Sequence, residues 1–165
     1  MDILAIYASP RKRGNTDMLL DAFTDAAERT GAGVKRLYVR ELDIRFCREC
    51  RLCEKEGRCP VNDDMQKVYP LLEKARAVVL GSPIFFYSVT SCVKSLIDRS
   101  QALWARKYVL NNPLACEAGG TGRLGYFLSC GATKGEDLFK GSILTVKYFF
   151  DAVGVQLAES LTYRR

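Results

Sequence analysis

Residues 3–33, ILAIYASPRKRGNTDMLLDAFTDAAERTGAG, decide the fold of this chain. The segment opens with a short, continuous apolar run over residues 3–7, which is typical of a parallel strand buried on both faces. A polar loop follows, and apolar residues such as Leu19 and Phe23 then recur at helical spacing. A strand, a loop and a helix in this order predict the first unit of an α/β sheet.

The loop after this strand carries hydroxyl groups, an amide and several cations beside the start of the helix. Backbone N–H groups at a helix N-terminus, together with such side chains, form an anion-binding site. Asn15 or Thr16 is expected to cap the helix. The alternative is an ordinary capped loop. We predict a monophosphate site made of Ser9, Arg11, Lys12, Gly14, Asn15 and Thr16.

Further strands are expected, separated by helical segments, over residues 34–39, 77–81, 125–129 and 155–163. This alternation predicts a parallel sheet with right-handed crossovers. We therefore expect a single domain over residues 1–165, α/β in class. It would be a doubly wound, five-stranded parallel sheet of order 2-1-3-4-5, with a cysteine-rich insertion at residues 45–61 after the second strand.

Two later loops carry groups suited to a flat ligand. The loop after the third strand has a proline and three successive aromatic residues, which would make an apolar wall for a planar ring. Packing on the next helix or on a partner subunit is the alternative. Glycines after the fourth strand would let backbone amides approach a ligand closely. The residues concerned are Ser82, Pro83, Ile84, Phe85, Phe86 and Tyr87 in one loop, and Gly131, Ala132, Thr133 and Gly135 in the other.

The predicted strand order brings the phosphate loop and the aromatic loop together. In an open doubly wound sheet, ligands bind beyond the carboxyl ends of the strands at the switch point. Strands one and three are neighbours there. A molecule with a phosphate at one end and a flat ring at the other would occupy both loops, and flavin mononucleotide (FMN) is such a molecule.

A run of cysteines lies between the second strand and the next helix. Cys47, Cys50, Cys53 and Cys59 have the spacing C-x2-C-x2-C-x5-C. Short runs of this kind bind iron–sulfur clusters, and an excess of nearby cations would stabilise a negative core. Structural zinc usually takes two separated C-x2-C pairs. Zinc, a disulfide and free thiols remain the alternatives to a cluster at this stage.

Two other features of the sequence carry less weight. Residues 101–122 are expected to be the least regular part of the chain. The G-x-G-x-x-G match at residues 120–125 precedes a strand, whereas a dinucleotide fingerprint follows one, so we reject it. Cys92, Cys116 and Cys130 are expected to be small buried residues.

Composition narrows the class of function. The chain has 165 residues, a formal net charge of +6, seven cysteines and no histidine, so imidazole-based catalysis is excluded. Its basic residues are spread out, and no nucleic-acid partner is expected. No apolar run approaches membrane-spanning length, and no export signal is recognisable. A cytoplasmic protein without a membrane partner is the expectation.

Several motifs resemble the NAD(P)H-dependent FMN reductase superfamily. They are ASPRKRGNT at residues 8–16, GSPIFFY at residues 81–87 and KSLIDR at residues 94–99. The cysteine run, followed by Asp63-Asp64-Met65, resembles the iron–sulfur flavoprotein branch. The resemblance covers nearly the whole chain.

This resemblance implies a flavodoxin-like fold and a set of site residues. Ser9, Arg11, Asn15 and Thr16 would hold the FMN phosphate, residues 83–86 would line the flavin ring, and residues 131–135 would close its other side. The four cysteines of the run would bind a 4Fe–4S cluster.

The resemblance also implies a homodimer or homotetramer in which the cluster of one subunit lies near the flavin of another. Electrons would pass from ferredoxin or NAD(P)H to a small acceptor such as oxygen, peroxide or quinone. A cluster-free NAD(P)H-dependent FMN or quinone reductase is one alternative, because many relatives carry no cluster. A non-catalytic electron carrier or a thiol redox sensor is another.

Overall fold

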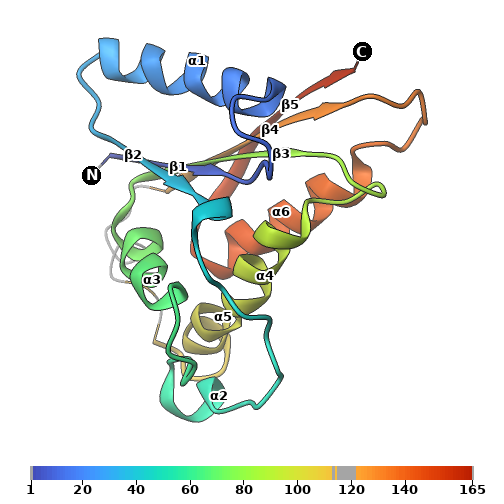
Figure 1. Ribbon diagram of the computed structural model, residues 1–165. Coiled ribbons are helices and arrows are strands. Elements are labelled where there is room, and N and C mark those ends of the chain that lie inside the picture. Colours follow the sequence, from blue (N-terminus) through green and yellow to red (C-terminus); the bar gives the residue numbers. More distant parts are fainter. Residues whose placement is uncertain (1, 113, 115–121, 165) are drawn as a thin grey trace.

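The protein is built on one parallel sheet, described here from a computed structural model for residues 2–112, 114 and 122–164 (Figure 1). The strands run parallel in the order β2-β1-β3-β4-β5. Their bounds are β1 (Ile3–Tyr7), β2 (Val34–Tyr38), β3 (Ala77–Pro83), β4 (Leu124–Gly131) and β5 (Gln156–Arg164). The predicted class and strand order are confirmed, and this order is that of flavodoxin-like folds.

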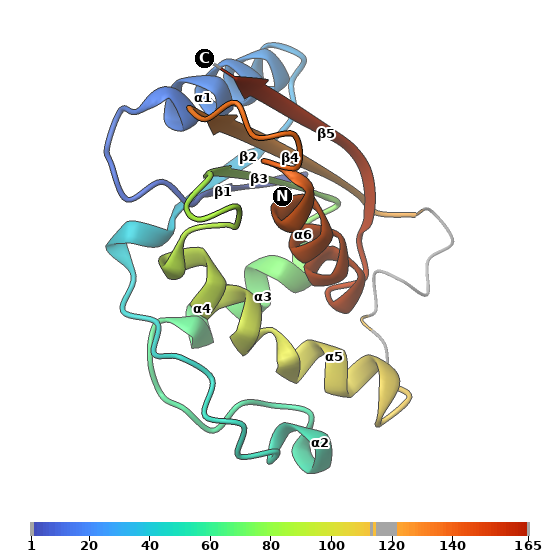
Figure 2. The same ribbon diagram turned by 90° about the vertical axis from the view of Figure 1, so that its right-hand side faces the viewer.

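Helices lie on both sides of the sheet (Figures 1 and 2). One side carries α1 (Asn15–Arg29), and the other carries α3 (Met65–Lys74), α4 (Ser91–Arg99), α5 (Gln101–Tyr108) and α6 (Lys140–Ala152). The larger hydrophobic core lies on the α3–α6 side and includes Leu80, Leu96 and Phe150. A smaller core under α1 includes Leu20 and Val79.

The position of a strand in the sheet explains its burial. Residues 4–7 of β1 and 78–80 of β3 are buried, because neighbouring strands and helices cover both of their faces. β5 lies at the edge, and its Leu161 and Tyr163 are exposed. The central strands therefore form the rigid part of the sheet, and their carboxyl ends fix the loops described below.

The start of α1 differs from the prediction. Neither Asn15 nor Thr16 caps the helix, because Asn15 is already helical and the N-cap position falls on Gly14. The preceding residue, Arg13, has a φ of 55°, and its backbone N–H is bonded to the side chain of Asp17. The Asp17 carboxylate thus fixes the residue before the N-cap, and the N-cap itself makes no side-chain hydrogen bond to the first-turn N–H groups.

The expectation that residues 101–122 are irregular is wrong for residues 101–108, which form α5. This helix follows α4 with Ser100 alone between them, and the Ser100 hydroxyl donates to the Leu96 carbonyl at 3.0 Å. Ala102, Leu103 and Ala105 are buried. The apolar spacing of a helix was present in the sequence, but the close junction with α4 obscured it.

Some predictions lie outside the described residues, namely those for Cys116 and for the first two residues of the 120–125 glycine motif. Cys92 and Cys130 are half-buried rather than fully buried. Within the described part of the chain, no helix combines the length and apolar character needed to cross a membrane.

Candidate functional site

A buried ion pair holds the loop between β1 and α1. Arg40, which follows β2, donates from Nη1 to the Ser9 carbonyl oxygen at 3.1 Å and lies 3.0 Å from the carboxylate of Asp17. Asp17 in turn accepts the backbone N–H of Arg13 at 3.0 Å. The Ser9 hydroxyl accepts the backbone N–H of Arg11 at 3.2 Å. The loop is therefore organised by its own bonds, which lowers the cost of ordering it around a ligand.

The six predicted phosphate-binding residues all lie at the N-terminal end of α1. Three of them are buried, namely Ser9, Gly14 and Thr16. The other three, Arg11, Lys12 and Asn15, are exposed. The first N–H groups of a helix have no intrahelical partner, and they attract an anion. Arg40 balances the negative charge of Asp17 in this turn. An anion here would therefore meet backbone donors and exposed cations, with the nearby carboxylate neutralised.

The loop after β3 presents its aromatic side chains instead of burying them. Phe85 and Ser88 close a tight turn through two backbone hydrogen bonds of 2.9 and 3.0 Å. At the tip, Phe86 and Tyr87 have positive φ values of 50° and 61°. This conformation is rare for bulky residues, and such strain is concentrated at ligand sites. The Phe86 side chain is fully exposed, so it does not pack on the following helix within this chain.

The loop after β4 contacts the aromatic loop. A Cβ atom at Gly135 would clash with the Tyr87 hydroxyl, and one at Gly141 would come 2.7 Å from the Tyr87 carbonyl oxygen. The Ile84 backbone N–H also donates to the Cys130 carbonyl oxygen at 3.2 Å. The predicted third loop, residues 131–135, therefore lies beside the second.

Hydrogen bonds cross-link the strand ends that carry these loops. The Ala8 N–H donates to the Gly81 carbonyl oxygen at 2.8 Å, and the Thr90 hydroxyl donates to the Ala8 carbonyl oxygen at 2.7 Å. The Ser129 hydroxyl donates to the Ser82 carbonyl oxygen at 2.7 Å. The structure thus brings the loops after β1, β3 and β4 to one edge of the sheet, as predicted.

Two residues of this edge were missed by the sequence analysis as loop-organising groups: Arg40 and Asp17. Arg40 lies just after β2 in a single 3-10 turn, Val39–Glu41, where the prediction continued the strand to Val39. Its guanidinium carbon also stands 4.7 Å from the centre of the Tyr38 ring. The sequence did contain one signal for this pair, namely the acidic residue Asp17 in the first turn of α1. A carboxylate that becomes buried requires a cationic partner.

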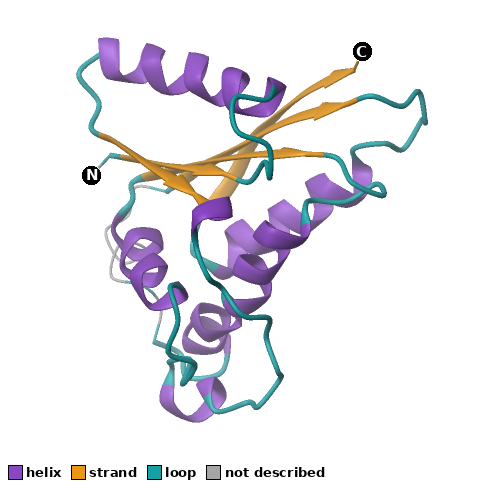
Figure 3. Cartoon of the chain, in the orientation of Figure 1, coloured by secondary structure: helices purple, strands orange, loops and turns teal. Residues whose placement is uncertain are grey.

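The four predicted metal-binding cysteines lie on a segment that extends away from the sheet and includes the short helix α2 (Cys53–Glu56). In Figure 3 this helix is the lowest purple element, joined on both sides by teal loops. Glu49 and Arg51, on either side of Cys50, have positive φ values of 50° and 57°. Positive φ values are uncommon for residues other than glycine, so the backbone on both sides of Cys50 has an unusual conformation. Gly57 ends α2 in the left-handed conformation, where a side chain would meet Arg106 of α5.

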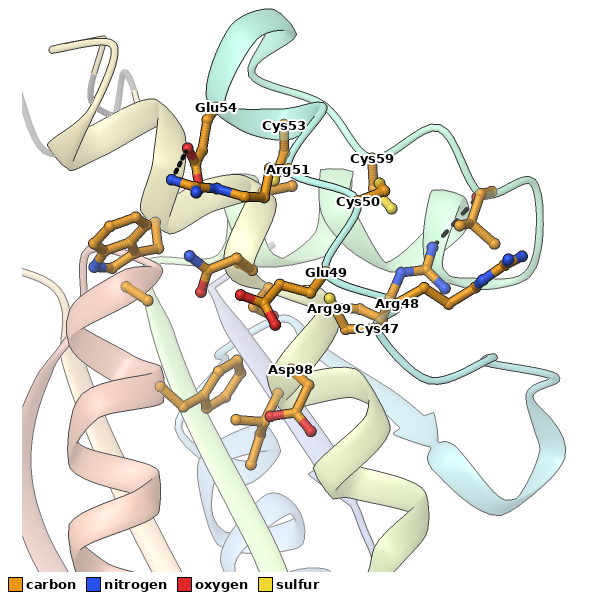
Figure 4. Close-up of a pocket in the computed structure, with 18 of the residues that line it drawn as sticks. Cys47, Arg48, Glu49, Cys50, Arg51, Cys53, Glu54, Cys59, Asp98 and Arg99 are labelled. Atoms are coloured by element: carbon orange, nitrogen blue, oxygen red, sulfur yellow. Dashed lines mark hydrogen bonds and ion pairs between the residues drawn. The ribbon is translucent and has the colours of Figure 1, made fainter.

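All four thiols line a cavity of about 970 Å³ between this loop and helices α4, α5 and α6 (Figure 4). None of them forms a disulfide. Burial, and then the charges of the other thiols beginning with Cys59, raise the pKa of the Cys53 thiol. The Cys53 thiol therefore lies within electrostatic range of the other three thiols.

The donor set fits a cluster better than a single ion. Among the described residues, no group of three or more cysteine, aspartate or glutamate side chains is arranged to hold one metal ion. A cubane offers a separate iron to each thiolate, so its ligands do not converge on one point. Four cysteines that line one cavity supply the kind of ligand that such a group takes.

The two sites lie in separate parts of the molecule. The cysteine loop lies beyond α3, α4 and α5, away from the sheet edge where the three loops meet (Figures 1 and 2). Within one chain, helices α4 and α5 lie between α2 of the cysteine loop and the sheet (Figure 2).

Comparison with known proteins identifies the family. Residues 1–133 match the family model for NADPH-dependent FMN reductase. An iron–sulfur flavoprotein of Archaeoglobus fulgidus is 38% identical over 112 residues, 68% of this chain and 55% of the relative. Iron–sulfur flavoprotein MJ0731 of Methanocaldococcus jannaschii is 31% identical over 154 residues, 91% of this chain and 71% of the relative. The chain belongs to the NADPH-dependent FMN reductase family, in its iron–sulfur flavoprotein branch.

The fold comparison agrees with this assignment. A flavone reductase structure superposes with a TM-score of 0.71 at 20% identity, covering 99% of this chain and 54% of the other. At this identity the likeness shows the fold alone. The chain spans about half the length of several curated relatives that it matches, with 45%, 53% and 55% of them covered.

Proposed function

We propose that this protein is an FMN-dependent oxidoreductase whose flavin lies across the loops after β1, β3 and β4. The observation that carries the proposal is the meeting of these loops at one sheet edge, with the N-terminus of α1 at one end and exposed aromatic side chains at the other. The membership of an FMN reductase family supports the same cofactor.

In this proposal each loop has a distinct task. The α1 N-terminus and the residues Ser9, Arg11, Lys12, Gly14, Asn15 and Thr16 bind the phosphate, with Arg40 keeping the loop in shape. Residues 82–87 and 131–135 enclose the ring between aromatic side chains and backbone amides. Bound flavin supplies the redox chemistry, for which the protein provides position and electrostatic environment. Cations at the phosphate end favour a negatively charged ligand.

The second part of the proposal is a 4Fe–4S cluster on Cys47, Cys50, Cys53 and Cys59. Four thiols lining one cavity, and relatives named iron–sulfur flavoproteins, support it. The protein would pass electrons from a donor such as ferredoxin or NAD(P)H to a small acceptor such as oxygen, peroxide or quinone. We propose that it acts in the cytoplasm. We also propose that it forms a homodimer or homotetramer, because the cysteine loop and the edge where the three loops meet lie apart within one chain (Figure 1).

The experiment that tests the flavin proposal is retention of FMN. Purified protein is incubated with FMN, passed through gel filtration and examined by its visible spectrum. We expect a yellow protein that carries about one FMN per chain. A colourless protein would contradict the proposal, whatever the cysteines bind.

The cluster is tested separately. Anaerobic reconstitution with iron and sulfide should give about four of each per chain, as expected for a 4Fe–4S cluster. The second candidate function, a cluster-free NAD(P)H-dependent FMN or quinone reductase, is supported by the match to the NADPH-dependent FMN reductase family. It predicts rapid oxidation of NAD(P)H by the FMN form with less than one iron per chain.

A further inference from the structure

A buried side chain, Arg99 at the end of α4, forms hydrogen bonds to both ends of the cysteine loop. Its Nη1 donates to the Arg45 carbonyl oxygen at 3.0 Å, two residues before the first cysteine of the run. Its Nη2 donates to the Val61 carbonyl oxygen at 3.3 Å, two residues after the last cysteine. One guanidinium therefore closes the loop that carries all four thiols.

A buried carboxylate holds this guanidinium in place. Asp63 accepts Nη1 at 2.6 Å and Nη2 at 3.1 Å, and both side chains are 1% exposed. Asp63 also accepts the backbone N–H groups of Arg45 and Met65 at 3.1 Å. A two-pronged pair of this kind fixes the orientation of the guanidinium plane as well as its position.

One N–H group of the Arg99 side chain has no hydrogen-bond partner in the described part of the chain. A guanidinium has five N–H groups, and the four on Nη1 and Nη2 are directed at Arg45, Val61 and Asp63. Nε is buried and has no hydrogen-bond partner in the described part of the chain. A buried donor without a partner costs free energy, so it marks a place where another acceptor belongs.

The surroundings of Arg99 indicate which acceptor this is. Arg99 lines the cavity that the four cysteines line (Figure 4). Its Nη2 donates to the Val61 carbonyl oxygen, two residues after Cys59, so the guanidinium lies at the Cys59 end of the loop. The Tyr69 hydroxyl donates to the Arg99 carbonyl oxygen at 2.8 Å and secures the same corner.

We propose that Arg99 is a positioning residue for the metal group at the four cysteines: it clasps both ends of their loop and offers Nε as a hydrogen-bond donor to sulfur at the Cys59 corner. This inference rests on the proposed cluster. Because a donor and a positive charge beside the sulfur atoms stabilise the more negative reduced state, Arg99 raises the reduction potential of the cluster.

The test replaces Arg99 by lysine, which keeps the charge and can pair with Asp63 but lacks the planar fork and Nε. Wild-type and Arg99→Lys proteins are reconstituted anaerobically, and the cluster potential is measured by a spectroscopic redox titration. We expect the equilibrium between reduced and oxidised cluster to shift about tenfold toward the oxidised form, close to 59 mV for one electron. FMN retention should be unchanged.

Arg51→Lys is the matched control, since Arg51 lies in the same loop with its guanidinium exposed and bonded to Glu54 at 2.9 and 3.0 Å. It should shift the equilibrium less than twofold. An Arg99→Lys potential equal to that of wild type would overturn the inference. If Arg99→Lys does not retain FMN, the charge-balanced double variant Asp63→Asn with Arg99→Gln is measured instead. The expected results for the double variant are the same tenfold shift toward the oxidised cluster and unchanged retention of FMN.

The outcomes separate this inference from the proposed function. A wild-type protein that takes up no iron would overturn the cluster and the role of Arg99 together, and would leave the flavin proposal standing. A wild-type cluster with unchanged potentials in the variants would overturn the role of Arg99 alone. If both Arg99 variants lose iron but retain FMN, the result would support the inference that Arg99 holds the two ends of the cysteine loop in place for the metal group.

Discussion

The sheet edge and the cysteine loop are organised by different means. At the edge, backbone and hydroxyl hydrogen bonds such as Ala8 N–H to Gly81 and Thr90 to Ala8 extend the order of the parallel sheet into the loops. The cysteine loop lies away from the sheet, and Arg99 with Asp63 joins its two ends. The fold of the sheet thus sets the geometry of the site at the strand ends, whereas the cysteine loop is held by side-chain contacts that include a buried ion pair.

The largest effect should come from a variant that removes one function and keeps the other. Cys59→Ser should lose the cluster on anaerobic reconstitution, because a serine hydroxyl is a poor ligand for iron compared with a thiolate. FMN should be retained, since α2 and the cysteine loop around it lie away from the sheet edge (Figure 1). Iron, sulfide and FMN are measured per chain.

Cys92→Ser is the control for this variant, because the Cys92 thiol lies on α4 beside the Thr90 hydroxyl and outside the cysteine loop. It should bind as much iron as wild type. Iron uptake by Cys59→Ser at the wild-type level would remove Cys59 from the metal site, and loss of FMN as well would mean that the two regions depend on each other.

The next effect is on stability. Asp63→Ala leaves the buried guanidinium of Arg99 without its carboxylate, and breaking a buried pair in this way costs about 3–5 kcal/mol. Denaturant unfolding of the FMN form measures the free energy of unfolding. Glu54→Ala, which breaks the exposed pair with Arg51 in the same loop, should cause no resolvable loss. Equal losses in the two variants would contradict the special role of the buried pair.

A smaller effect is expected at the sheet edge. Arg40→Gln leaves the carboxylate of Asp17 unbalanced in the first turn of α1, where it would repel a phosphate. The Kd for FMN should rise about tenfold to a hundredfold, or roughly 1.4–2.8 kcal/mol. Fluorescence titration measures this Kd.

Arg36→Gln serves as the comparison for Arg40→Gln, because Arg36 pairs with Asp25 and Glu28 farther along α1. Its Kd for FMN should stay within about twofold of wild type, less than 0.5 kcal/mol. A similar rise in both variants would indicate a general effect of charge instead of local support of the loop.

The smallest effect concerns contact between two loops of the edge. A methyl group at Gly135 would displace the Tyr87 ring, so Gly135→Ala should raise the Kd for FMN about fivefold, close to 1 kcal/mol. Gly122→Ala is the matched change, since a Cβ atom there meets open space. An unchanged Kd for Gly135→Ala would show that Tyr87 does not help to hold the ring.

Much of the sheet edge was predictable because the signals are local. Apolar runs such as residues 3–7 and 77–81 define buried strands, and glycines and aromatics directly after them mark the loops. The course of the helices was less clear, and α5 was missed because Ser100 alone separates it from α4. The part played by Arg40 was not predictable, since its partners Ser9 and Asp17 are distant in sequence.

The sequence by itself determined the α/β class, the strand order and the four thiols, because hydrophobic periodicity and cysteine spacing are properties of neighbouring residues. Only the tertiary structure decided how the cysteine loop is closed. Arg99 is 54 residues from Arg45 and 36 from Asp63 along the chain. A buried cation finds its partners through packing in three dimensions, which no local pattern specifies.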